Sequence, residues 1–165
     1  MIKSPLPVLS LASLVATLLA TGVHHVFRLG PELVIPALVG IGLPVVLFAF
    51  YQRTGTRLLL WLYAGYAALV VFWFGFLDGF LDHVAKAAGL DNVTFLPGGE
   101  ADTVATTMTL WSQSASTAFY EGTGILSAAL ALMTMIVTSF FVFEELNPKK
   151  AGHINSTLGA ANHKG

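Results

Sequence analysis

The stretch LLLWLYAGYAALVVFWFGFL, residues 58–77, decides the fold, because its twenty residues include no Asp, Glu, Lys or Arg. A transmembrane α-helix needs about 20 apolar residues to cross a hydrocarbon layer roughly 30 Å thick, and this stretch has that length. Further runs without a charged residue occur at 4–27, 33–52 and 122–143. The sequence therefore predicts four transmembrane helices.

The composition of the whole chain supports this interpretation. The chain has 165 residues, of which 55% are hydrophobic and 10% are charged, and its mean hydropathy is +0.75. Soluble domains carry about 25% charged residues. The net charge of −1 offers no electrostatic attraction to nucleic acid, and the absence of cysteine excludes disulfides, thiolate metal sites and cysteine nucleophiles. We predict an all-α integral membrane protein, a four-helix transmembrane bundle whose first partner is the lipid bilayer.

The bundle is predicted to form a single domain over residues 1–146. Its helices are expected at about 5–27, 33–52, 57–80 and 121–144. The long link, 81–120, is predicted to be an extracytoplasmic segment in which helix three continues to Gly89, a residue type that commonly ends helices. An amphipathic helix should follow in this link, because apolar residues recur there at helical spacing: Val104, Met108, Trp111, Ala115 and Ala118. Residues 147–165 are polar and are predicted to be a flexible cytoplasmic tail.

The orientation follows from the distribution of positive charge, which favours the cytoplasmic side of a membrane protein. If the N-terminus is cytoplasmic, that side holds Lys3, Arg53, Arg57, Lys149, Lys150 and Lys164. The opposite side then holds only Arg28 and Lys86. We therefore predict a multi-pass protein with both termini in the cytoplasm and an acidic outer face.

Small and hydroxyl-bearing residues form stripes along the predicted helices. The stripe of helix one is Ser10, Ser13, Thr17, Thr21, His24 and Arg28, and that of helix four is Thr123, Ser127, Ala131, Thr134 and Thr138. Helices in lipid associate through such faces, so we expect these stripes to pack together, with a water-lined path behind them as the alternative. In helix two, Pro36, Gly40 and Pro44 interrupt the backbone hydrogen bonds, so neighbouring helices must satisfy the freed carbonyl groups.

Directly after the opening stretch comes DGFLDHV, residues 78–84, which brings Asp78, Asp82 and His83 together. In an α-helix Asp78 and Asp82 lie about 40° apart, whereas His83 lies about 100° beyond Asp82 and flanks their face. Charged groups at this depth are expected to face the bundle interior or a wet cavity. Helix one ends at the same predicted membrane level with a histidine pair, and helix four begins there with a glutamate.

The candidate metal ligands are therefore His24, His25, Asp78, Asp82, His83 and Glu121. Imidazole and carboxylate together suit zinc, iron, manganese or copper(II). Two alternatives stay open. These residues can be ordinary interface residues, with ion pairs such as Asp82 with Lys86 and Arg28 with Glu32, or a histidine of helix one and His83 can hold a b-type haem.

No compact catalytic motif is present, and the central third of each predicted helix lacks Asp, Glu, Lys and Arg. We therefore expect a non-catalytic subunit or an assembly or accessory factor of a membrane complex, with a membrane-protein partner or a second copy of the chain. The alternative function is a metal-binding or metal-handling membrane protein, with its site at the outer mouth of the bundle.

Overall fold

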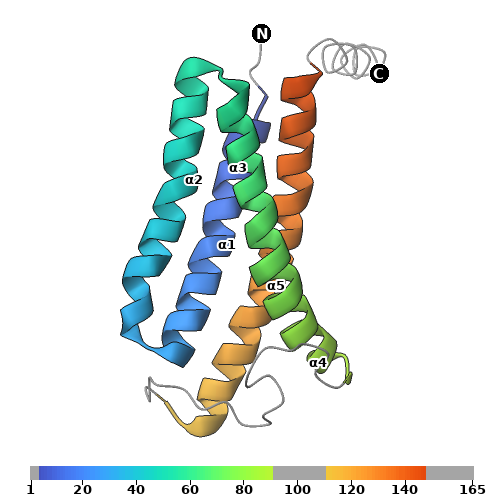
Figure 1. Cartoon of the computed structure of the whole chain (residues 1–165). Coiled ribbons are helices and arrows are strands. Elements are labelled where there is room, and N and C mark those ends of the chain that lie inside the picture. Colours follow the sequence, from blue (N-terminus) through green and yellow to red (C-terminus); the bar gives the residue numbers. More distant parts are fainter. Residues whose placement is uncertain (1–3, 91–110, 148–165) are drawn as a thin grey trace, which may run out of the picture.

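The computed structural model describes residues 4–90 and 111–147, and every regular element in these ranges is a helix (Figure 1). The elements are α1 (Leu6–Leu29), the 3₁₀-helix η1 (Pro31–Leu33), α2 (Val34–Thr54), α3 (Arg57–Val70), the π-helix η2 (Val71–Val84), α4 (Ala85–Ala87) and α5 (Gln113–Leu146). No strand occurs in the described ranges. The all-α prediction is confirmed for this part of the chain.

Within the described residues, four helical stretches are long and apolar enough to cross a membrane: Leu6–Leu29, Pro31–Thr54, Arg57–Ala87 and Gln113–Leu146. The shorter stretches have 24 residues, which at about 1.5 Å per residue exceed the thickness of a hydrocarbon layer. The third stretch runs through α3, η2 and α4. It ends before Gly89, whose positive φ of 81° suits glycine, and the Gly89 N–H donates to the carbonyl of Lys86.

The last long helix begins earlier than the sequence indicated. The predicted start was residue 121, whereas α5 begins at Gln113, because the Ser112 hydroxyl accepts a hydrogen bond from the Ala115 N–H and caps the helix. The end of the link 81–120 is thus the beginning of α5. The rest of the amphipathic helix predicted in this link, and the predicted tail beyond residue 147, lie outside the described residues.

The predicted hydroxyl stripes form the contact between α1 and α5. The Ser10 hydroxyl lies 2.8 Å from both the Tyr63 hydroxyl of α3 and the Thr138 hydroxyl of α5. Further along the same interface, the hydroxyls of Thr17 and Thr134 are 3.0 Å apart. These side chains bond to one another directly across the helices, so they act as packing groups, as the first of the two alternatives expected.

Glycines allow η2 to lie close against α5. A Cβ atom at Gly75 would overlap the Cβ of Ala131, and one at Gly79 would lie 2.9 Å from the backbone nitrogen of Ala128. Neither contact is possible for a real side chain, so only glycine permits this approach. The close contact fixes η2, and with it the polar residues at its end, against α5.

The interruption in α2 is satisfied by its neighbour, as predicted. Pro44 has no N–H, so it cannot bind the carbonyl group of Gly40, four residues earlier. The Tyr66 hydroxyl of α3 donates a hydrogen bond of 2.7 Å to this carbonyl. Apart from such contacts α2 is peripheral, since Pro44 and Tyr51 are its only buried residues.

The ends of the four long helices lie at two levels (Figure 1). At one level the start of α1 meets the end of α5, where the Ser4 hydroxyl donates to the Glu144 carboxylate over 2.6 Å. The opposite level holds the end of α1, the end of η2 and the first turns of α5. This second level contains all six predicted site residues.

Candidate metal centre

The π-helical winding of η2 gathers its polar residues on one buried face. Asp78, Asp82 and His83 are all buried there. An α-helix would place Asp78 and His83 about 140° apart. The hydrogen bonds of a π-helix join residues five apart, so Asp78 and His83 become neighbours on one side. The prediction that His83 flanks the aspartate face was therefore wrong, because it assumed α-helical geometry.

His24, Asp78 and His83, which we call the buried triad, come together from α1 and η2. Each can offer one ligand atom such that the three atoms lie within 4.8 Å of one another. Only 1% of His24, 7% of Asp78 and 1% of His83 is exposed. The Nε2 atom of His24 lies 4.0 Å from the Oδ2 atom of Asp78.

The hydrogen bonds behind the triad fix the imidazole tautomers. The His83 Nδ1–H donates to the Glu121 carboxylate over 2.8 Å. The His24 Nδ1 lies 3.0 Å from the Thr123 hydroxyl, which itself donates to the backbone carbonyls of Phe119 and Tyr120 and therefore accepts from His24. With a proton on Nδ1, both rings keep a lone pair on Nε2. This arrangement of a metal-binding nitrogen with an anchored second nitrogen is usual for histidine ligands.

The triad thus presents acceptors without a donor between them. The Nε2 atom of His83 and the Oδ2 atom of Asp78 are buried and have no hydrogen-bond partner. The 4.0 Å between His24 and Asp78 is too long for a hydrogen bond. Each buried polar atom left without a partner costs about 1–3 kcal/mol. A divalent cation would satisfy all three residues at once.

The geometry is close to that of a metal site. A tetrahedral ion with bonds of about 2.1 Å holds its ligand atoms roughly 3.4 Å apart. The ligand atoms of the triad lie within 4.8 Å of one another, so movements of about 1 Å per side chain would close the site. Two imidazoles and one carboxylate suit zinc, iron, manganese or copper(II) and leave further positions on the metal open.

Aromatic and glycine contacts hold the triad in place. The Tyr120 ring stacks on His24 with 4.2 Å between the ring centroids, and the rings of His24 and His83 meet edge to face at 4.9 Å. The His83 ring lies so close to Gly124 that a Cβ atom there would overlap it. Arg28 donates a hydrogen bond to the Tyr120 hydroxyl. This packing does not fit a b-type haem held by His24 and His83, because the two rings are in contact and no porphyrin plane can enter between them.

The other predicted site residues surround the triad without joining it. The Nε2 atom of His25 lies 4.0 Å from Oδ1 of Asp78, whereas His24 lies at the same distance from Oδ2. Glu121 accepts a hydrogen bond from Nδ1 of His83 and another, of 3.0 Å, from Lys86. Asp82 is buried and its Oδ1 atom has no hydrogen-bond partner. Thr123, Tyr120 and Gly124 were not predicted as site residues: Thr123 was noted only for its place in a packing stripe, and no sequence signal marked the other two.

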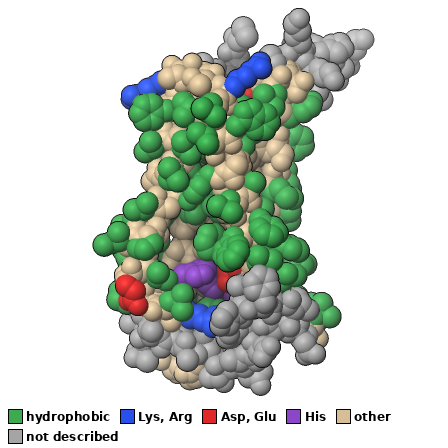
Figure 2. Space-filling view, viewed as in Figure 1, with side chains coloured by type: hydrophobic (Ala, Val, Ile, Leu, Met, Phe, Trp, Pro, Cys, Tyr) green, Lys and Arg blue, Asp and Glu red, His purple; other side chains and the backbone are tan. Residues whose placement is uncertain are grey.

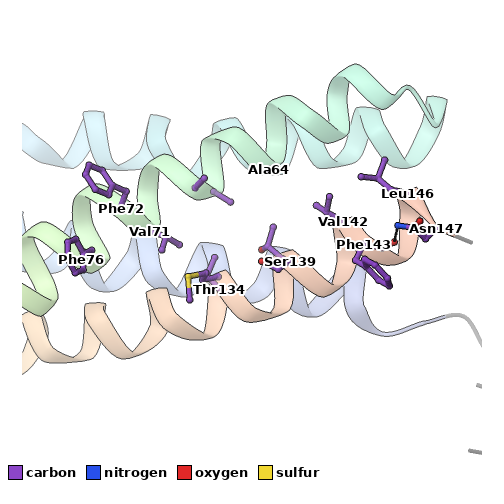
Figure 3. A pocket seen from close by; sticks show the side chains of 14 residues that line it. Ala64, Val71, Phe72, Phe76, Thr134, Ser139, Val142, Phe143, Leu146 and Asn147 are labelled. Carbon is purple, nitrogen blue, oxygen red and sulfur yellow. Dashed lines mark hydrogen bonds between the residues drawn. The ribbon is translucent and has the colours of Figure 1, made fainter. Parts of the chain in front are cut away.

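Two of the cavities in the described residues differ in whether a predicted site residue lines them. One of about 720 Å³ lies between α5 and the continuous helix of α3 and η2, and its lining includes Ala64, Phe72, Ser139 and Leu146 but none of the six predicted site residues (Figure 3). The other, of about 310 Å³, has His25 in its wall. The space-filling view shows histidine side chains in a hollow toward the end of the molecule that holds the triad (Figure 2). Among the described histidines, His25 is the partly exposed one.

Comparisons of the chain with protein-family models, with curated proteins and with solved structures gave no match. The class of protein therefore follows from the fold and the site. Its described part is all-helical, with four helices long and apolar enough to cross a membrane. At one end of these helices lies a buried His–Asp–His set that could hold a metal ion.

Proposed function

We propose that this chain is a multi-pass membrane protein that binds one divalent transition metal ion in the buried triad. The observation that carries the proposal is the convergence of acceptor atoms from His24, Asp78 and His83 without a donor between them. A structural cluster of buried polar groups normally satisfies its own hydrogen bonds. This cluster instead anchors the Nδ1 atom of each imidazole and leaves Nε2 of His83 and Oδ2 of Asp78 without a hydrogen-bond partner, as metal ligands require.

The distribution of positive charge supports an orientation for the site. With both termini in the cytoplasm, the end of η2 and the start of α5 face the outer side of the membrane. The triad then lies just inside the outer interface, within reach of ions outside the cell. A buried carboxylate at such a depth is costly by itself, and a bound cation offsets that cost. The proposed role is therefore the capture of a metal ion from the extracytoplasmic side.

Elemental analysis of the full chain purified in detergent tests the proposal. After incubation with Zn²⁺ and removal of free metal, the wild type should hold about one ion per chain, since a formed set of ligands retains its metal. Asp78→Asn and His83→Gln should abolish this retention. His163→Ala, which removes an imidazole distant in sequence from the triad, is the matched control and should retain the metal. Equal retention by Asp78→Asn and the wild type would overturn the proposal, as would a wild type that holds no metal.

A second candidate function is that of a non-catalytic subunit or assembly factor. The low burial of α2 favours this function. Only 6% of the most apolar part of the span Pro31–Thr54 is buried inside the protein, whereas the value for α1 is 39%. A helix with so few contacts inside its own chain has a free surface for packing against a partner membrane protein or a second copy of the chain. Purification from the native membrane at natural expression levels separates the possibilities, because a monomer without any co-purifying protein contradicts the subunit role.

A further inference from the structure

His25 differs from the two histidines of the buried triad. Its side chain is 27% exposed, whereas the side chains of His24 and His83 are 1% exposed. Its Nδ1–H donates to the Thr21 carbonyl over 3.0 Å, so its Nε2 also carries a free lone pair. This Nε2 lies 4.0 Å from Oδ1 of Asp78, while the Nε2 of His24 lies 4.0 Å from Oδ2. Asp78 therefore faces a partly exposed imidazole with one oxygen and a buried imidazole with the other, and the two imidazole rings meet edge to face at 5.2 Å.

His25 also borders the cavity of about 310 Å³, which we call the side cavity. Residues of α1, α2, α3 and η2 line it, among them Thr21, Pro36, Tyr66 and Phe74, together with Leu33 of the turn between α1 and α2. The exposed Glu32 precedes Leu33 and adds negative charge near this turn, which attracts cations. None of the three triad residues lines the side cavity, so His25 is the residue that connects its wall to Asp78.

We infer that His25 and Oδ1 of Asp78 form an entry site, which takes a divalent transition metal ion from the side cavity and passes it across the Asp78 carboxylate to the buried triad. This inference rests on the proposed function. The entry site offers two protein ligands and the triad offers three, so transfer inward exchanges a looser site for a tighter one. Each step also replaces water ligands of the ion by protein ligands, and the ion is never buried without a partner.

The position of His25 suits transfer better than permanent binding. The two imidazoles approach different oxygens of Asp78, since His24 lies 4.0 Å from Oδ2 and His25 lies 4.0 Å from Oδ1. The His25 ring is held by one hydrogen bond and by edge contacts with the rings of His24 and Phe74, but it is partly exposed, so it changes rotamer more readily than the buried rings of the triad. His25 is thus expected to govern how fast the metal enters and leaves, and the triad to govern how tightly it is held.

Metal-binding kinetics of the full chain in detergent test this inference. Zn²⁺ uptake by the metal-free protein is followed with a fluorescent zinc indicator, and release is followed after excess EDTA is added. His25→Ala should slow both uptake and release by about tenfold, because the ion loses one ligand on its way to Asp78 and the barrier rises equally in both directions. The dissociation constant should stay unchanged. Leu33→Ala, which alters the side cavity without removing an imidazole, should leave both rates unchanged.

Three results would overturn the inference. Unchanged rates in His25→Ala would show that His25 plays no part in entry. A loss of affinity as large as that of His83→Gln would make His25 a permanent ligand. An equal slowing by Leu33→Ala would assign the effect to the shape of the cavity. A wild type that binds no Zn²⁺ at all is a separate outcome, which removes the proposed function together with the inference.

Discussion

Asp78 and His83 stand five positions apart in η2 and contribute ligand atoms to the same buried space. The relationship depends on the π-helical winding, since an α-helix would turn His83 about 140° away from Asp78. The π-helix is rare, appears mostly as single turns inside α-helices, and is found frequently at functional sites. The rest of η2 is apolar, as expected of a membrane helix. Its π-helical winding places a carboxylate and an imidazole on the side that faces α1.

The first prediction concerns the free energy that the unpaired Asp78 carboxylate costs the metal-free protein. Asp78→Asn should stabilise the metal-free protein by about 1–2 kcal/mol, because it removes a buried oxygen without a partner and supplies an amide donor to the facing lone pairs. The same change should abolish stabilisation by Zn²⁺, which for the wild type reaches about 2.7 kcal/mol at a free concentration 100 times the dissociation constant. Thermal unfolding of the detergent-solubilised protein, with EDTA or with Zn²⁺, measures both effects.

The opposite pattern would contradict this prediction. If Asp78→Asn lowers the melting temperature in EDTA, the Asp78 carboxylate has a stabilising partner, and its role is structural. Asp102→Asn is a suitable control, because it removes one carboxylate at a distant sequence position and should change neither melting temperature. Shifts common to both variants would reflect net charge alone.

The second prediction uses the glycine behind His83. Gly124→Ala places a methyl group where the His83 ring now lies, so the ring must move out of the triad. Because displaced or misoriented ligands typically cost 10–100-fold in affinity, we expect a loss of about this size for Zn²⁺. Gly122→Ala on the same helix has open space around its Cβ and is the matched control. Equal affinities for the two variants, measured by competition with a zinc chelator, would show that His83 does not bind the metal.

Much of the fold was predictable because its causes are local in the sequence. The lack of charge over residues 58–77 defined a span by length alone, and the spacing of Ser10, Thr17 and their neighbours defined the face that meets α5. The level at which the site residues meet followed from the same spans. These arguments need only the period of a helix and the thickness of a bilayer.

The details of the site could not be predicted, because they depend on contacts distant in sequence. The stretch around Asp78 and His83 carries no compositional mark of π-helix, so its winding was missed. The different surroundings of His24 and His25 depend on which side of α1 meets Tyr120 and which borders the side cavity. Lys86 is a third case: the sequence offered its i−4 neighbour Asp82 as a partner in one of the open alternatives, whereas the structure pairs Lys86 with Glu121 of α5.

The third prediction tests the anchoring of His83. Glu121→Gln keeps the shape of the side chain but weakens the acceptor for His83 Nδ1–H and removes the ion pair with Lys86. The affinity for Zn²⁺ should fall about 10–100-fold while about one ion per chain still binds at saturation. Glu145→Gln removes an equivalent carboxylate, one that binds Tyr51 at the other end of the bundle, and should leave metal binding unchanged. Loss of the bound ion at saturating Zn²⁺ would instead make Glu121 a direct ligand.

The fourth prediction concerns orientation in the membrane. The chain has no cysteine, so single cysteines can be introduced without any background reaction. Glu32→Cys, in the turn between α1 and α2, should react with a membrane-impermeant maleimide in intact cells. Thr54→Cys, at the opposite end of α2, should react only after the cells are opened. The reverse labelling pattern would place the metal centre on the cytoplasmic side and end the proposal of capture from outside.

The fifth prediction concerns the hydrogen bond from the Tyr66 hydroxyl to the Gly40 carbonyl of α2. Tyr66→Phe leaves the Gly40 carbonyl without its donor, which should destabilise the protein by about 1–3 kcal/mol in its apolar surroundings. In a Pro44→Ala background the same change should cost much less, because the substituted alanine supplies the backbone N–H that Pro44 lacks. A double-mutant cycle on thermal unfolding measures this coupling. Equal costs in the two backgrounds would mean that Tyr66 stabilises the helix pair by packing alone, and metal affinity should stay unchanged throughout because the bond lies apart from the triad.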